Sequence, residues 1–245
     1  MKGNFQSPME EKLKEGIMVL DSGCGPATWS LDMAEMYPQS TFYGVDVYPV
    51  FPNEVKPQNC HFQACNVAEK LPFPDNHFDF IHQRLLIFGL TRADWRNAIK
   101  ELVRVLKPGG YLEILECDIE FENEGPMQHR VMSAIFQAFV KKDMSPSVSR
   151  ELGPEYLEPI EQLQDIKDKV VSFPMNHGGK LGSLFWDDFR HACEALHAWV
   201  MKEDVEFEDL EVYKQFLGEC AQECSEYKTN MPWHCYSCQK KPESA

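Results

Sequence analysis

The segment from Ile17 to Tyr37 constrains the fold of this chain more than any other. It reads IMVLDSGCGPATWSLDMAEMY. A short apolar run at 17–20 is long enough for a buried strand, and a glycine-rich turn follows it. From Thr28 onward, apolar residues return at helical spacing. A strand, a glycine turn and a helix in this order predict the first half of a nucleotide-binding βαβ unit, in which N–H groups at the helix start face the ligand.

The glycine turn allows two interpretations. A dinucleotide fingerprint, G-x-G-x-x-G/A, needs glycine or alanine at position 28, where this chain has Thr28. In the other interpretation an acid, Asp21, stands two residues before Gly23, and Gly25 follows. That pattern resembles motif I of class I S-adenosylmethionine-dependent methyltransferases, whose common form is VLDxGCGxG. This chain has Ala27 where the common form has its third glycine.

Two later segments strengthen this resemblance. Residues 71–84, LPFPDNHFDFIHQR, resemble the LPFPDNSFDFIHxR stretch of the same family, particularly of its fungal members. Residues 101–114, ELVRVLKPGGYLEI, are a second specific match. The resemblance covers 17–118, and it implies a Rossmann-like, doubly wound α/β fold. Such a fold has a mostly parallel seven-stranded sheet with a final antiparallel strand, and helices on both faces.

The hydrophobic pattern predicts where the elements of this fold lie. We expect strands at 17–20, 40–45, 61–65, 78–82, 111–115, 169–174 and 233–239, and helices at 9–15, 28–37, 94–106, 126–140, 183–201 and 207–226. The two late helices would be an insertion near the C-terminus, between the last two strands. We expect a single domain over 1–245, with a cofactor-binding core at 17–118 and the remaining sheet and acceptor-side helices at 119–245.

Candidate cofactor-binding residues follow the predicted strands. Asp46 lies 23 residues after Gly23, near the place where a Rossmann-type fold puts the carboxylate that holds a ribose. The resemblance implies that Asn66 and Val67 contact the adenine, although the family usually has an acid at position 66. The amide oxygen of Asn66 can still accept a hydrogen bond. The predicted cofactor-binding set is Asp21, Gly23, Cys24, Gly25, Asp46, Val47, Asn66, Val67 and Gln83.

Methyl transfer requires that the acceptor be aligned with the methyl group and that water be excluded. For hydroxyl or acid acceptors it also benefits from a base. His82 is the candidate base, because it ends a predicted strand at the ligand crevice and histidine is the side chain that most often serves as a general base. The alternative is that His82 packs in the wall of the site. Glu116 and Asp118 end the next predicted strand and could position an amine.

Composition narrows the classes of partner. Thirty-nine acidic against 24 basic residues give a formal net charge of −15, which repels nucleic acids and anionic membranes. No apolar run is long enough for a membrane span or a signal peptide, so we expect a cytoplasmic or nuclear protein with reduced thiols. Cys220, Cys224, Cys235 and Cys238 could in principle bind zinc, but their spacing is unusual, and we predict no metal.

Three functions follow from these patterns. The first is S-adenosylmethionine-dependent methyl transfer to a small-molecule acceptor by in-line displacement. The second is a catalytically weak or inactive regulatory protein that binds the same cofactor, with an unknown protein partner. The third, a nicotinamide-dependent dehydrogenase, is disfavoured by Thr28 and Asp21 and by the lack of a recognisable hydride-transfer constellation.

Overall fold

The computed structural model describes residues 3–52 and 54–242, and it divides the chain into two compact units. Unit 1 comprises the described residues of 1–116, 150–169 and 234–245, and unit 2 comprises 117–149 and 170–233. The chain therefore passes between the units several times rather than once near residue 118. The expected single domain over 1–245 stays a prediction.

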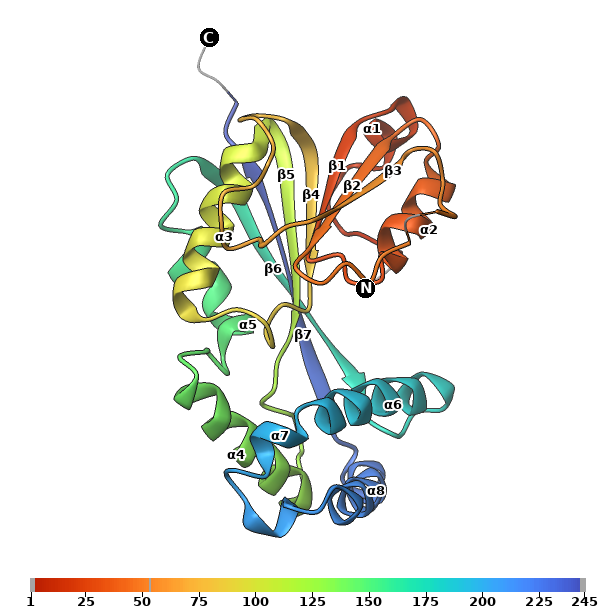
Figure 1. Ribbon diagram of the computed structural model, residues 1–245, viewed down its shortest axis with the longest axis vertical. Helices are drawn as coiled ribbons and strands as arrows, with labels where there is room; N and C mark the ends of the chain where they lie inside the picture. Colours follow the sequence, from red (N-terminus) through yellow and green to blue (C-terminus); the bar gives the residue numbers. More distant parts are fainter. Residues whose placement is uncertain (1–2, 53, 243–245) are drawn as a thin grey trace. The chain divides into compact units, whose positions relative to one another are not determined.

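The strands form the predicted sheet. They are β1 (Met18–Ser22), β2 (Thr41–Asp46), β3 (Cys60–Ala64), β4 (Phe78–Arg84), β5 (Leu106–Cys117), β6 (Leu163–Pro174) and β7 (Asn230–Lys240). Their order is β3-β2-β1-β4-β5-β7-β6, and the pairs among β1 to β5 are parallel. The expected Rossmann-like sheet, mostly parallel with antiparallel pairing at its end, is confirmed (Figure 1).

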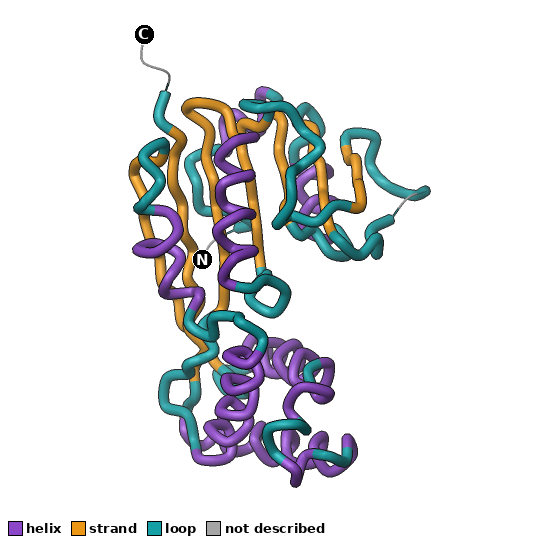
Figure 2. The backbone as a smooth tube through the Cα atoms, turned by 60° about the vertical axis from the view of Figure 1, so that its left-hand side comes forward, coloured by secondary structure: helices purple, strands orange, loops and turns teal. Residues whose placement is uncertain are grey.

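The helices of unit 1 follow the predicted pattern. They include α1 (Glu10–Glu15), α2 (Thr28–Met36) and α3 (Arg92–Val105), and the two views show α2 and α3 on opposite faces of the sheet (Figures 1 and 2). A capping box starts α3, in which Thr91 and Asp94 each accept the other's backbone N–H. A short helix α5 (Val148–Glu151) and the π-helix η1 (Leu152–Leu157) follow α4 in the chain, where the hydrophobic pattern predicted no helix or strand.

Unit 2 is mainly helical. It contains α4 (Pro126–Lys141), α6 (Lys180–Ala195), α7 (His197–Val200), the 3-10 helix η2 (Val205–Phe207) and α8 (Leu210–Tyr227). The expectation of one helix at 183–201 is wrong, because α6 ends at Ala195 and α7 begins after Leu196. The insertion between the last two strands is confirmed, since α6, α7 and α8 lie between β6 and β7 in the chain. No helix among the described residues is long and apolar enough to cross a membrane.

The Lys107-Pro-Gly-Gly110 segment lies within β5 and not between the expected helix at 94–106 and the expected strand at 111–115. The strand β5 begins at Leu106, directly after α3, instead of at Tyr111. Leu106 pairs with Phe78 and Tyr111 pairs with Phe80, so residues 107–110 all face the single residue between them on β4. That residue, Asp79, accepts hydrogen bonds from the Lys107 ammonium and from the backbone N–H of Met18.

A buried carboxylate fastens the N-terminal strap, which we define as residues 4–9. Glu113 on β5 is only 2% exposed. Its oxygens accept the backbone N–H groups of Gln6 and Ser7, at 2.9 and 2.7 Å, and the Ser7 hydroxyl at 2.6 Å. Because a buried charge is costly without partners, these bonds hold the strap on the sheet.

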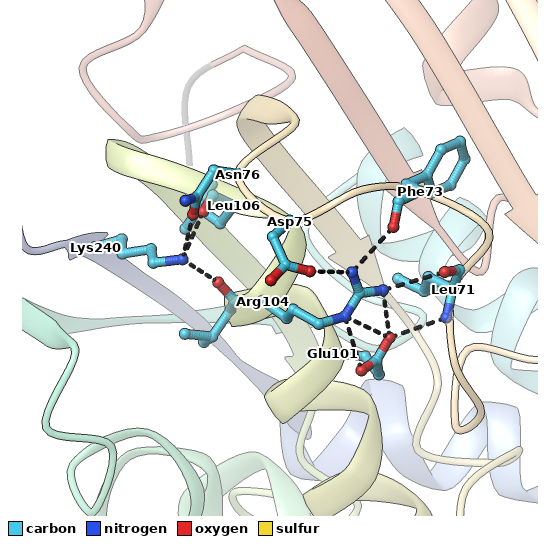
Figure 3. Close-up of polar contacts among 9 residues, drawn as sticks. Leu71, Phe73, Asp75, Asn76, Glu101, Arg104, Leu106 and Lys240 are labelled. Carbon is cyan, nitrogen blue, oxygen red and sulfur yellow. Dashed lines mark hydrogen bonds and ion pairs between the residues drawn. The ribbon is translucent and has the colours of Figure 1, made fainter.

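Arg104 at the end of α3 organises the loop before β4 (Figure 3). Its guanidinium donates to the backbone oxygens of Leu71 and Phe73 and to the carboxylates of Asp75 and Glu101. The hydrogen bonds from Arg104 hold the pKa of the Glu101 carboxyl below its usual range. One side chain therefore fixes the start and the middle of the loop at 71–77.

Lys240 on β7 supports the same region from the other side of α3. Its ammonium donates to the backbone oxygens of Val103 and Leu106 and to the side-chain oxygen of Asn76, at 2.7–2.8 Å. Since an ammonium has three N–H donors, these acceptors account for all of them. The last strand is thereby bonded to the junction of α3 and β5.

Replacing Arg104 by methionine tests the role of this network. We expect Arg104→Met to lower the free energy of unfolding by about 2 kcal/mol, because it leaves two backbone oxygens without a donor and removes the charged donor from the partly buried Glu101. Lys100→Met, one turn earlier on the same helix and exposed, is the matched control and should change stability by less than about 0.5 kcal/mol. Denaturant unfolding measures both, and equal effects would contradict this account.

Candidate functional site

The glycine turn after β1 is bonded to the end of β2. The backbone N–H groups of Gly23 and Cys24 donate to the oxygen of Val45, at 2.8 and 3.0 Å. The N–H of Gly25 donates to the Asp46 carboxylate at 2.8 Å. Two predicted elements, the glycine turn and the acid 23 residues beyond it, are thus in direct contact.

The backbone of this turn needs its glycines. Gly23 and Gly25 have φ of +70° and +51°, a region that favours residues without a Cβ. A Cβ on Gly23 would lie 2.6 Å from Cδ2 of Leu86, whereas one on Gly25 would meet open space. Ala27, which replaces the third glycine of the motif, also has a positive φ of 63° and is fully buried. The turn therefore holds a left-handed conformation even at its non-glycine position.

The carboxylate of Asp46 can accept more hydrogen bonds than those it receives from the backbone. One carboxylate oxygen accepts the N–H of Gly25 and the other accepts the N–H of Tyr48, at 2.8 and 2.9 Å. Each carboxylate oxygen can accept two hydrogen bonds, so both can also receive a hydroxyl. Two vicinal hydroxyls of a ribose match this arrangement.

The predicted adenine contacts, Asn66 and Val67, follow β3, and the predicted cofactor contact Val47 follows β2. Asn66 is engaged locally, because its side-chain oxygen accepts the N–H of Ala68 and its amide donates to Glu69. That oxygen keeps a second lone pair for a donor. Val67 is buried, whereas Val47, directly after Asp46, is 57% exposed. An exposed apolar side chain at this place can pack on a flat ring.

Asp21 and His82 lie next to each other across β1 and β4, where they are paired in register. The Asp21 carboxylate accepts the Ser30 hydroxyl at 2.6 Å, and its other oxygen lies 3.7 Å from Nδ1 of His82. The His82 ring is 2% exposed and stacks on Trp29 with centroids 4.0 Å apart. The indole N–H of Trp29 donates to the backbone oxygen of Asn4 in the strap. Sequence reasoning did not identify Trp29 and Ser30 as supports of this pair.

Gln83 carries an unused donor at the end of β4. Its side chain is fully buried, and its oxygen accepts the hydroxyl of Ser22 at 3.0 Å. Its amide nitrogen has no hydrogen-bond partner among the described residues. A buried donor without a partner is energetically costly. The free amide N–H of Gln83 therefore indicates a group to which a ligand accepts a hydrogen bond. Together with the glycine turn and Asp46, this donor fits S-adenosylmethionine, a ligand with both a ribose and a carboxylate.

Glu116 was considered from the sequence as a group that could position an amine. Its carboxylate is fully buried near the end of β5, and its oxygens accept the N–H groups of Leu86 and Ile87, at 2.8 and 3.2 Å. Burial raises the pKa of Glu116 to about 8. Asp118 accepts the N–H of Glu120. Both acids therefore already bind backbone groups of the chain.

The thiols give no sign of a metal centre. None of the nine cysteines, all of which lie in the described part of the chain, forms a disulfide, and eight of them are buried. No group of three or more histidine, cysteine or acidic side chains among the described residues could hold a metal ion. Burial raises the pKa of the Cys24 thiol well above its usual range, so this predicted cofactor contact is neutral at physiological pH. We infer that Cys24 contributes shape and backbone to the turn rather than charge.

Comparisons with known proteins agree with this geometry. Residues 19–110 match the family model described as "Methyltransferase domain". The chain is 29% identical over 178 residues to "Methyltransferase str2" of Strobilurus tenacellus and 32% identical over 189 residues to "N-methyltransferase sirN" of Leptosphaeria maculans. These matches cover 71% and 70% of the chain and 62% of each relative.

A relative of another description is also similar. The chain is 27% identical over 164 residues to "Secondary metabolism regulator laeA" of Aspergillus flavus, which covers 64% of the chain and 43% of the regulator. The chain thus spans less than two thirds of the length of each of these three relatives.

Solved structures share the fold. A phosphoethanolamine N-methyltransferase of Haemonchus contortus, solved with S-adenosylhomocysteine, has a TM-score of 0.56 at 15% identity and covers 93% of this chain and 49% of its own. The [4+2]-cyclase SpnF has a TM-score of 0.55 at 15% identity, with 96% and 81% covered. The glycine turn, the acid that follows β2, the sheet order and the family model agree. The chain therefore belongs to the class I S-adenosylmethionine-dependent methyltransferase family.

Proposed function

We propose that this chain binds S-adenosylmethionine at the carboxyl ends of β1 to β4 and transfers its methyl group to a small-molecule acceptor by in-line displacement. The observation that carries the proposal is the hydrogen bond from Gly25 to Asp46. It joins the glycine turn to a carboxylate that still has lone pairs for two ribose hydroxyls.

Each predicted residue has a defined task in this proposal. Gly23, Cys24 and Gly25 supply a close-fitting backbone, and Asp46 binds the ribose. Asn66 and Val67 contact the adenine, as the family resemblance implies, and the exposed side chain of Val47 packs on the cofactor beside Asp46. Gln83 donates its free amide N–H to the methionine end of the cofactor, and Asp21 stabilises the start of α2 through Ser30.

Little further chemistry is required of the chain. When bound, S-adenosylmethionine supplies a methyl group that its positive sulfur has already activated. The protein must align the acceptor with this group and exclude water. A base assists acceptors that lose a proton, and His82 is the predicted base.

A small-molecule acceptor is supported by charge and by the relatives. A formal net charge of −15 opposes binding of nucleic acids. One relative is named an N-methyltransferase. We propose no protein partner, and a cytoplasmic or nuclear location stays a prediction.

A second candidate is a regulatory protein that binds the cofactor without efficient turnover. Two departures from the family pattern favour it, namely Ala27 in a left-handed conformation and Asn66 in place of an acid. Similarity to a protein named as a secondary metabolism regulator agrees with it. Formation of S-adenosylhomocysteine with a panel of amine, hydroxyl and carboxylate acceptors separates this candidate from the first.

The ribose assignment predicts a loss of affinity when Asp46 is replaced. Asp46→Ala should weaken S-adenosylhomocysteine binding by about 2 kcal/mol, or roughly thirtyfold, because two hydroxyls lose their acceptors. Calorimetric titration measures the affinity, and a thermal melt checks that the protein stays folded. Asp32→Ala, an exposed acid on α2, is the control. Wild-type affinity in Asp46→Ala would show that the ribose is bound elsewhere.

Gly23 tests the glycine turn itself. Gly23→Val should abolish detectable binding of S-adenosylmethionine, because the turn needs a positive φ and the new side chain would collide with Leu86. Gly218→Val on α8 serves as a control, since a Cβ there meets open space. The same titration decides between the outcomes, and normal binding by Gly23→Val would contradict the motif interpretation.

His82 needs an experiment that separates a base from a packing residue. If His82 is the base, His82→Ala should lower turnover by about 10² or more while affinity for S-adenosylhomocysteine changes less than about twofold. If its ring mainly holds Trp29 and Asp21, both quantities should fall together. Turnover and titration on the same preparation distinguish these cases, and unchanged turnover would remove His82 as a base.

A further inference from the structure

The loop after β4 begins with an unfavourable backbone conformation. Leu85 has φ of +58°, in the left-handed region that a branched side chain rarely adopts. Leu85 directly follows Arg84, and the backbone N–H groups of the next two residues, Leu86 and Ile87, bond a side chain instead of a neighbouring strand's backbone. Such a conformation persists only where neighbouring groups hold it.

The side chain of Glu116 holds the loop in this conformation. Each of its carboxylate oxygens accepts one N–H, from Leu86 at 2.8 Å and from Ile87 at 3.2 Å. The carboxyl group is fully buried, so water cannot replace these two N–H groups as its partners. Glu116 therefore bonds two successive residues of the loop after β4.

The side chain of Leu86 links this loop to the glycine turn. Its Cδ2, Cδ1 and Cγ atoms lie within 3.1 Å of the position that a Cβ on Gly23 would take. Leu86 thus lies directly against the Cα of Gly23, where the backbone bends toward the ligand. A displaced Leu86 would leave that side of the turn unsupported.

We propose that Glu116 is a positioning residue, which holds Leu86 against Gly23 and thereby fixes the glycine turn in the shape that binds the cofactor. This inference rests on the proposed cofactor site and deepens it. Glu116 has no contact with cofactor or acceptor in this role, and it acts through the backbone of Leu86.

A double-mutant cycle tests the linkage. Glu116→Gln keeps the shape of the side chain but replaces one acceptor oxygen with a donor, so one backbone N–H loses its partner. Leu86→Ala keeps both hydrogen bonds and removes the contact with Gly23. We expect each change to weaken S-adenosylhomocysteine binding about tenfold. Because both act through one contact, the double variant should also lose about tenfold rather than a hundredfold.

The chain offers a matched control on the same strand. Glu113→Gln makes the same chemical change at a buried carboxylate three residues earlier, which binds the N-terminal strap instead of the loop. It should lower the melting temperature while leaving the affinity within about twofold of wild type. Hydrogen exchange without ligand adds a second readout. In Glu116→Gln, the amides of 85–87 and 23–25 should exchange faster, and those of the strap should not.

The outcomes separate this inference from the proposed function. Wild-type affinity in Glu116→Gln, or independent tenfold losses that multiply in the double variant, would overturn the positioning role while the cofactor site stands. Equal losses in Glu113→Gln and Glu116→Gln would also overturn it, because they would show a general effect of buried carboxylates. If the wild-type protein binds no S-adenosylhomocysteine, the proposed cofactor site itself fails.

Discussion

The central strands of the sheet carry buried polar side chains, and the need to satisfy them shapes the surrounding structure. Asp21, His82 and Glu113 lie side by side across β1, β4 and β5. Desolvating a carboxylate costs several kcal/mol unless hydrogen bonds replace the lost water. Each acid therefore bonds one segment outside the sheet, α2 in the case of Asp21 and the strap in the case of Glu113. Apolar side chains at these three positions could also pack, but they would form no hydrogen bonds with α2 or with the strap.

The same logic extends to the other side of the cofactor turn. Glu116 bonds the loop after β4, and Asp46 bonds the glycine turn. Flexible segments are thereby attached to rigid strand ends, which is how a site on loops can keep a defined shape. The buried ring of His82, stacked on Trp29, belongs to this framework whether or not it also moves a proton.

Local sequence patterns predicted where the strands and the glycine turn lie, whereas the arrangement of the sheet was implied by the family resemblance. Alternating and continuous apolar runs marked the strands, and Gly23 and Gly25 marked the turn because few residues adopt a positive φ. The partners of Glu113 and Glu116 could not be predicted, since they lie about 106 and 30 residues away in the chain. The break at Leu196 was missed because helical periodicity continues across that residue. The early start of β5 was missed because a pair of glycines ordinarily ends a helix or strand.

The distribution of thiols offers a native point of attachment beside the site. Eight of the nine cysteines are buried, and only Cys65 is partly accessible. It follows β3 directly, its backbone N–H donates to the oxygen of Asp46, and Asn66 is its neighbour. A maleimide fluorophore or spin label would therefore attach mainly there without any engineered cysteine. Its signal would report the occupancy of the adenosine end of the proposed cofactor site without any change of sequence.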